Sequence, residues 1–206
     1  MPSVTEVLGY STPPPLVEWF KRNSKAKSEA IAASTSEIGQ GVDTLVQQDI
    51  KEGGYVPPFD SDPMNNCLAG WEKVKTEHPG FIESVTEMQT ELRVGEMVGH
   101  PDFIHGTVPW GITDLKCTSG IRTKNWIQTA KYARMLMEER GWPMPAFLRI
   151  IRLKRDEPTY EWLEITEKDM IKYCMDSFDH YLGVFNDEPF LKEYFRSKLE
   201  EDILDV

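Results

Sequence analysis

The chain has 206 residues, of which 40% are hydrophobic and 11% aromatic, and its formal net charge is −11. Intrinsic disorder is excluded because so many aromatic side chains can bury large apolar areas, and the length suits one ordinary domain. The negative charge disfavours a protein that binds nucleic acid through a basic surface, unless the 23 Lys and Arg residues gather locally.

The first 80 residues predict an N-terminal part that is mainly helical. One helix is expected to follow the proline run at residues 13–15, and residues 30–48 are rich in helix formers. Residues 53–63 carry Gly, Pro and Asp at the density of a loop. This loop is expected to separate the helices from the rest of the chain.

Three short strands are predicted next, near residues 85–94, 96–105 and 108–117. Gly-containing turns separate them, which indicates an antiparallel meander. Residues 123–140 then predict a helix with Trp126, Ala130, Ala133 and Met137 on one apolar stripe, which should face the core. Gly141 is expected to end this helix.

Two more strands are predicted at residues 146–153 and 159–165, because both stretches are rich in β-branched and aromatic residues. Thr166 and Asp169 have the spacing of a helix cap, so a helix is expected from there to about Leu182. Gly183 should end it before a last, acidic helix.

These elements predict a mixed α/β (α+β) fold with a central mixed sheet of about five strands flanked by helices, in the order αβββαββα. We expect a single domain over residues 1–206. Residues 1–80 would form its helical part, 81–165 its core and 166–206 its C-terminal helices.

Two acids and a lysine carry the chemistry that the sequence suggests. Asp102 is placed at a strand end, and Asp114 and Lys116 come about a dozen residues later on the next predicted strand. Side chains alternate along a strand, so Asp114 and Lys116 should share one face. Mg²⁺ prefers oxygen ligands such as two converging carboxylates, and a nearby lysine can stabilise charge on a phosphate under attack.

This pattern resembles the PD-(D/E)XK nuclease superfamily, with Asp102 as the first acid and Asp114-Leu115-Lys116 as the (D/E)xK element. Gln128 and Tyr132 resemble the Q-x-x-x-Y motif of the RecB-like branch, which has a lambda-exonuclease-like core. The resemblance implies a restriction-endonuclease-like fold. It also implies that Asp102, Asp114 and the Leu115 carbonyl hold Mg²⁺ or Mn²⁺ while Lys116 assists attack.

A further metal ligand is left open by the sequence. Residues 37–43 resemble the helical G-x-x-x-H element of that branch, with Asp43 where a histidine is common. Asp43 suits a hard cation, and Glu91 or Glu37 are alternatives. His100 and His105 flank Asp102 and are expected at the surface.

The resemblance implies a Mg²⁺- or Mn²⁺-dependent deoxyribonuclease in recombination, repair or viral replication, either exonuclease or endonuclease. Its partner would be single-stranded or duplex DNA, positioned by Gln128 and Tyr132, with Arg122, Lys124 and Lys131 on phosphates. The alternatives are an inactive nucleic-acid-binding or scaffold protein of the same fold, and a protein-interaction module that uses the C-terminal helices. The simplest structural alternative is an Asp114–Lys116 ion pair without catalysis.

Cellular context is bounded by two further features. No stretch of the sequence is apolar over the length needed to cross a bilayer, and the N-terminal residues lack the basic and apolar regions of a secretory signal. We therefore expect an intracellular, cytoplasmic protein without membrane contact, of host or viral origin. Cys67, Cys117 and Cys174 form no CxxC pair, which predicts reduced thiols and excludes an iron–sulfur cluster held by four cysteines of one chain. The four histidines lack the spacing of a zinc site.

Overall fold

The computed structural model describes residues 3–9, 25–55, 62–106, 109–183 and 185–186. The helices are α1 (Val4–Gly9), α3 (Lys25–Glu52), α4 (Asp62–Glu77), α5 (Gly80–Ser84) and α6 (Thr123–Arg140). The strands are β1 (Val85–Met88), β2 (Leu92–Val94), β3 (Met97–Gly99), β4 (Phe103–His105), β5 (Gly111–Lys116), β6 (Phe147–Leu153) and β7 (Tyr160–Ile165). Residues 168–183 are also helical.

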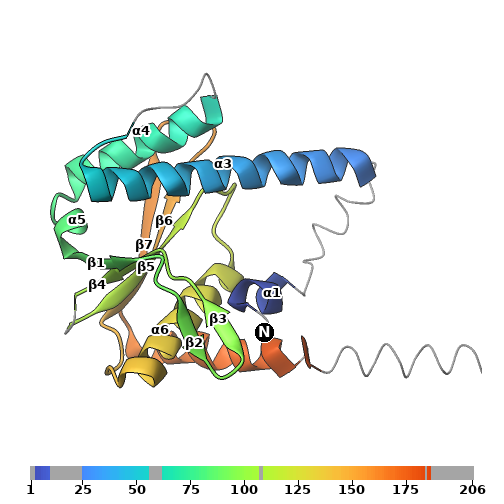
Figure 1. The fold of residues 1–206 in the computed structure, drawn as a ribbon, viewed down its shortest axis with the longest axis vertical. Helices are drawn as coiled ribbons and strands as arrows, with labels where there is room; N and C mark the ends of the chain where they lie inside the picture. Colours follow the sequence, from blue (N-terminus) through green and yellow to red (C-terminus); the bar gives the residue numbers. More distant parts are fainter. Residues whose placement is uncertain (1–2, 10–24, 56–61, 107–108, 184, 187–206) are drawn as a thin grey trace, which may run out of the picture.

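A five-stranded mixed sheet forms the centre of the fold, with the strand order β1-β4-β5-β6-β7 (Figure 1). Strands β5 and β6 are parallel, and the other neighbours are antiparallel. Helix α6 connects the two parallel strands, as a crossover must. The predicted mixed α/β fold with about five strands flanked by helices is confirmed, and the sheet is consistent with a restriction-endonuclease-like core.

The predicted three-strand meander is wrong in detail, because the first two stretches are each broken into two strands. Gln89 has a positive φ of 49°, and its N–H donates to the carbonyl oxygens of Pro101 and Asp102. This kink separates β1 from β2 and β3 from β4. As a result β1 pairs with β4 in the main sheet, while β2 and β3 form a separate two-stranded sheet.

Apolar side chains cover both faces of the main sheet. On one face Ile112 and Leu148 pack with α1, β2, α6 and the helix at 168–183, and on the other Leu115 and Ile151 pack with α3, α4 and α5. Figure 1 shows α3 and α4 on one side of the sheet and α6 on the other. Strand β5 therefore presents side chains to both layers.

Helix α6 lies where the sequence predicts it and ends at Gly141, whose positive φ of 65° allows its N–H to reach the Met137 carbonyl. Its apolar face is wider than the predicted stripe. Ala130 and Ala133 are fully buried, and Trp126 and Met137 pack at the edge of the core.

The expectations at the two ends of the chain have different outcomes. The C-terminal helix starts at residue 168, and Gly183 is itself helical, so the prediction that Gly183 ends this helix at Leu182 is wrong. The helix expected after the proline run, most of the predicted loop and the acidic tail lie outside the described residues. Among the described helices, none has both the length and the apolar character of a membrane span.

Candidate active site

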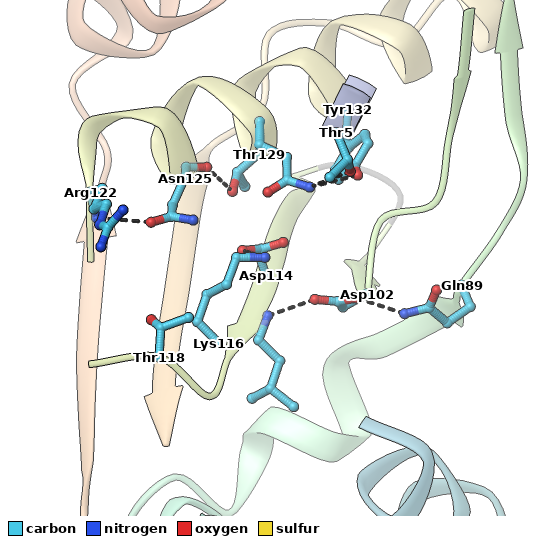
Figure 2. Close-up of polar contacts among 12 residues, drawn as sticks. Thr5, Gln89, Asp102, Asp114, Lys116, Thr118, Arg122, Asn125, Thr129 and Tyr132 are labelled. Carbon is cyan, nitrogen blue, oxygen red and sulfur yellow. Dashed lines mark hydrogen bonds and ion pairs between the residues drawn. The ribbon is translucent and has the colours of Figure 1, made fainter. Parts of the chain in front are cut away.

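Asp102 is held between two strands, immediately before β4. Its Oδ2 atom accepts a hydrogen bond of 2.7 Å from the N–H of Leu115 on β5, and its Oδ1 atom accepts one of 2.6 Å from Nε2 of Gln89 (Figure 2). The kink at Gln89 that divides the long hairpin therefore also fixes the Asp102 carboxylate beside β5.

Asp114 and Lys116 share one face of β5, as strand alternation predicts. The Nζ atom of Lys116 lies 2.6 Å from Oδ2 of Asp114. Asp114 is only 2% exposed, and its Oδ2 atom has no hydrogen-bond partner among the described residues. The ammonium is thus close enough for an ion pair but is poorly directed for a hydrogen bond, which leaves a desolvated carboxylate oxygen only partly compensated.

Asp43, from the middle of α3, meets these residues at one cavity of about 260 Å³. The same cavity is lined by Asp102, Asp114, Leu115 and Lys116. Residues from six separate stretches of the chain, including α1, α3 and α6, contribute to its wall. The structure therefore brings Asp43, which is distant in sequence, together with Asp102, Asp114 and Lys116.

At this cavity the carboxylates outnumber the cationic side chains. Burial, reinforced by the neighbouring Asp102, raises the pKa of Asp43 to about 7. Burial also raises the pKa of Asp114 to about 7, against the attraction of Lys116 and with repulsion from Asp102. Burial alone would favour loss of the Lys116 proton, but Asp114 and Asp102 outweigh it and raise the pKa of that ammonium. Lys116 therefore stays protonated at neutral pH.

Gln128 and Tyr132 form the wall of the cavity that α6 provides. The Nε2 atom of Gln128 lies 3.0 Å from the Tyr132 hydroxyl and 3.2 Å from Oγ1 of Thr5 on α1. The Tyr132 ring is buried in the core, so only its hydroxyl end reaches the cavity. A Cβ atom on Gly99 would lie 2.8 Å from this ring, which explains why glycine occupies that position of β3.

By chemical type, the donors at this cavity suit a hard divalent cation. The donor oxygens are carboxylate oxygens, their charge exceeds that of Lys116, and Oδ2 of Asp114 is a buried acceptor without a hydrogen bond. As they stand, no three His, Cys, Asp or Glu side chains within the described part of the chain are grouped closely enough to hold an ion. In this arrangement the Nζ atom of Lys116 lies next to Oδ2 of Asp114.

Five of the residues considered for the site do not line this cavity. Glu91 is exposed, with its carboxylate 2.6 Å from Nε of Arg93 and 3.6 Å from Nε2 of His100. Lys131 is buried, with Nζ 5.0 Å from the centre of the Phe178 ring, so its ammonium faces the C-terminal helix. Arg122 and Lys124 line a separate cavity. Glu37 is exposed.

His105 is buried, so the expectation that it lies at the surface is wrong. Its ring nitrogens contact the hydroxyls of Ser84 and Thr113, each at 2.8 Å, and burial, together with the charge of Arg149, lowers its pKa to about 3. His105 is therefore a neutral core residue that links β4 to β5. His100 is exposed as expected and lies at the cavity.

Sequence reasoning missed several contributors to the cavity wall, and the two that hydrogen-bond to predicted site residues are Gln89 and Thr5. A polar residue in a strand stretch otherwise suited to pairing was the only signal for Gln89. Thr5 carried none, because its place depends on how α1 packs against α6.

Comparison with known proteins adds no family assignment. No family model and no curated protein matches the chain. Among solved structures, the alkaline exonuclease LHK-Exo from Laribacter hongkongensis is 13% identical with a TM-score of 0.37, over 96% of this chain and 94% of that one. A protein described as SSO0001 is 13% identical with a TM-score of 0.30, over 66% of this chain and 84% of that one. At these TM-scores neither similarity supports a conclusion about the function of this chain.

Proposed function

We propose that the chain is a Mg²⁺- or Mn²⁺-dependent nuclease that hydrolyses phosphodiester bonds of DNA. One observation carries the proposal: Asp43, Asp102 and Asp114 come from three elements to one open cavity and leave buried negative charge that Lys116 only partly neutralises. Structural ion pairs are normally balanced, because an uncompensated buried charge destabilises the fold. Such an imbalance is typical of a functional site.

Asp102, Asp114 and Asp43 are the side chains that would hold the cation, with the Leu115 carbonyl as the main-chain candidate. A Mg²⁺ or Mn²⁺ ion there would supply a Lewis acid for the phosphate and acidify a bound water. The two hydrogen bonds to Asp102 keep its carboxylate in place without the ion, which reduces the reorganisation needed on binding.

Lys116 would act as a fixed positive charge rather than as a base. Its raised pKa keeps the ammonium protonated, so it can donate hydrogen bonds to a phosphoryl oxygen that gains charge during attack. Because Lys116 lines the cavity, its side chain would be within reach of a substrate that binds there. Gln128 and Tyr132 would position the strand through neutral hydrogen bonds, since burial raises the pKa of the Tyr132 hydroxyl.

The test is incubation of the protein with labelled single-stranded and duplex DNA in Mg²⁺, in Mn²⁺ and in EDTA. We expect cleavage only with a metal, and loss of cleavage in Asp114→Asn and Lys116→Gln. Asp176→Asn is the matched control, because Asp176 is an exposed carboxylate paired with Lys172 on the C-terminal helix. Cleavage in EDTA, or full activity of Asp114→Asn, would refute the assignment.

An inactive nucleic-acid-binding protein of the same fold is the second candidate. The close Asp114–Lys116 pair is the observation that favours it, since that contact occupies an oxygen a cation would need. DNA binding without cleavage, and without any stabilisation by Mn²⁺, would select this candidate.

A further inference from the structure

A second cavity, of about 380 Å³, opens where β5 leads into α6. It is lined by the loop after β5, by the first turn of α6, by one residue of α3 and by Arg155 after β6. Its volume of about 380 Å³ is roughly thirteen times the ~30 Å³ that a water molecule occupies in the liquid. The lining residues are Thr35, Thr118, Ser119, Gly120, Arg122, Lys124, Asn125 and Arg155.

The cavity wall carries three cationic side chains and no acidic one. Within the part of the chain that the structure describes, Arg122, Lys124 and Arg155 have no carboxylate within ion-pair distance. By contrast, the partly buried Arg140, Arg149 and Arg152 each pair with a glutamate. This is notable in a chain with 34 acidic residues. Burial, with added repulsion from Arg122, lowers the pKa of Lys124, and an anion in the cavity would offset that repulsion.

Hydrogen bonds fix the segments that line this cavity. Arg152 donates hydrogen bonds of 2.8 Å to the carbonyl oxygens of both Thr118 and Ser119, which fixes the loop. Arg155 donates from Nη2 to the Thr35 carbonyl on α3 at 3.4 Å, and its Nε atom is buried without a partner among the described residues. The start of α6 is fixed as well, because the Asn125 N–H donates to the Arg122 carbonyl at 2.9 Å and the Arg122 N–H donates to Oδ1 of Asn125 at 2.8 Å.

The two cavities share the same β-strand and helix. Thr118 lies two residues beyond Lys116, and Arg122 and Thr118 lie on one side of the Asp114–Lys116 pair in Figure 2, with Asp102 on the other. Along α6, the six helical steps from Arg122 to Gln128 span about 9 Å, or roughly three nucleotides at ~3.4 Å per step. A strand lying along α6 could therefore reach both cavities at once.

We propose that the cavity lined by Arg122, Lys124 and Arg155 binds a phosphate group of the nucleic-acid strand whose scissile phosphate lies at Lys116. The proposal rests on the proposed nuclease function. By binding this phosphate, the cavity would determine which phosphodiester bond of the strand lies at Lys116. Ser119 also lines this cavity, whereas the Thr118 hydroxyl donates to the Gly120 carbonyl at 3.0 Å. A cationic, partly buried pocket favours phosphate over neutral ligands.

The experiment measures binding of a short fluorescent single-stranded oligonucleotide, with and without a 5′-phosphate, in EDTA at several salt concentrations. The variants are Arg122→Gln/Lys124→Gln and Arg155→Gln. Lys168→Gln/Lys172→Gln is the matched control, since it removes the same charge from exposed positions of the C-terminal helix. We expect the first two variants to bind about tenfold more weakly. Each should also lower the slope of log K against log salt by about one.

Unchanged affinity and salt slope in both variants would overturn the phosphate site. If the wild-type protein still cleaves DNA in Mn²⁺, the failure is that of this cavity alone; if it neither binds nor cleaves DNA, the proposed function fails as well. A loss confined to the phosphorylated oligonucleotide identifies a terminal phosphate, and a loss with both identifies a backbone phosphate. The double variant changes only the first turn of α6, so it tests the site even if Arg155→Gln fails to fold.

Discussion

Replacing Asp114 by asparagine should make the metal-free protein more stable while it removes activity. The substitution keeps the size and polarity of the side chain but removes the charge that burial disfavours. Raising the pKa of Asp114 from 3.8 to about 7 corresponds to roughly 4 kcal/mol at about 1.4 kcal/mol per unit. Lys116 loses its partner in the variant, so we expect a net gain of about 1–2 kcal/mol.

The sign of this effect depends on pH. Because the folded pKa is raised, the unfolded chain loses the Asp114 proton first, so the wild-type protein loses stability as pH rises from about 4 to 7. The advantage of Asp114→Asn should therefore be largest at pH 8 and small at pH 5. For a chain of this size, 1–2 kcal/mol corresponds to a rise in Tm of about 2–8 °C.

The assay is thermal unfolding at pH 8 and pH 5, in EDTA and in Mn²⁺. Mn²⁺ should stabilise the wild-type protein and leave Asp114→Asn unchanged. Asp49→Asn is the control, because Asp49 is equally buried but accepts from Nε1 of Trp71 and pairs with Lys75, each at 2.7 Å. This control should lose stability and keep its response to Mn²⁺. A destabilised Asp114→Asn that still responds to Mn²⁺ would refute the reasoning.

Three further predictions concern catalysis, packing and pH. Lys116→Gln should lower the rate of DNA cleavage at least about 100-fold, measured at saturating Mn²⁺, because it removes the charge that faces the phosphate. Gly99→Ala should lower the free energy of unfolding in urea by about 1–3 kcal/mol, because its Cβ would lie 2.8 Å from the Tyr132 ring. Burial and Arg149 lower the pKa of His105 to about 3. The contribution of this ring to the free energy of unfolding should therefore fall by up to about 1.4 kcal/mol per pH unit below about pH 6.5. The measurement is the difference in free energy of unfolding between the wild-type protein and His105→Gln.

Each of these three has a contradicting outcome. A cleavage rate within tenfold of wild type in Lys116→Gln would remove that residue from the chemistry. For packing, the control is Gly39→Ala on α3, where a Cβ meets nothing within 4 Å, and equal effects at Gly39 and Gly99 would contradict the close-contact argument. A stability difference for His105→Gln that does not change with pH would mean that the folded protein protonates this ring.

The part of the site that lies on β5 and α6 could be predicted from the sequence, because local geometry determines it. Alternation along a strand places Asp114 and Lys116 together, and a spacing of four along a helix places Gln128 and Tyr132 together. Asp102 was also predicted, since it needed only two adjacent strands. The structure brings all five to one cavity, while their roles in catalysis stay a proposal.

The rest of the site and of the fold depends on tertiary contacts that no local sequence pattern predicts. Asp43 reaches the cavity and Glu91 does not, because α3 crosses the sheet near β5 whereas Glu91 lies in the exposed turn before β2. The break in the meander arises from Gln89, whose left-handed backbone is rare for a residue with a side chain. Likewise, the burial of Lys131 results from the helix that packs over α6 and not from charge pattern.

The most direct test of the central claim is to locate Mn²⁺ by anomalous scattering in crystals of the protein grown or soaked with the ion. We predict one strong peak within about 2.0–2.3 Å of carboxylate oxygens of both Asp102 and Asp114, with Asp43 nearby and Lys116 displaced from Asp114. No peak in this cavity, or a peak only at exposed acids such as Glu91, would contradict the claim that these aspartates form a metal site.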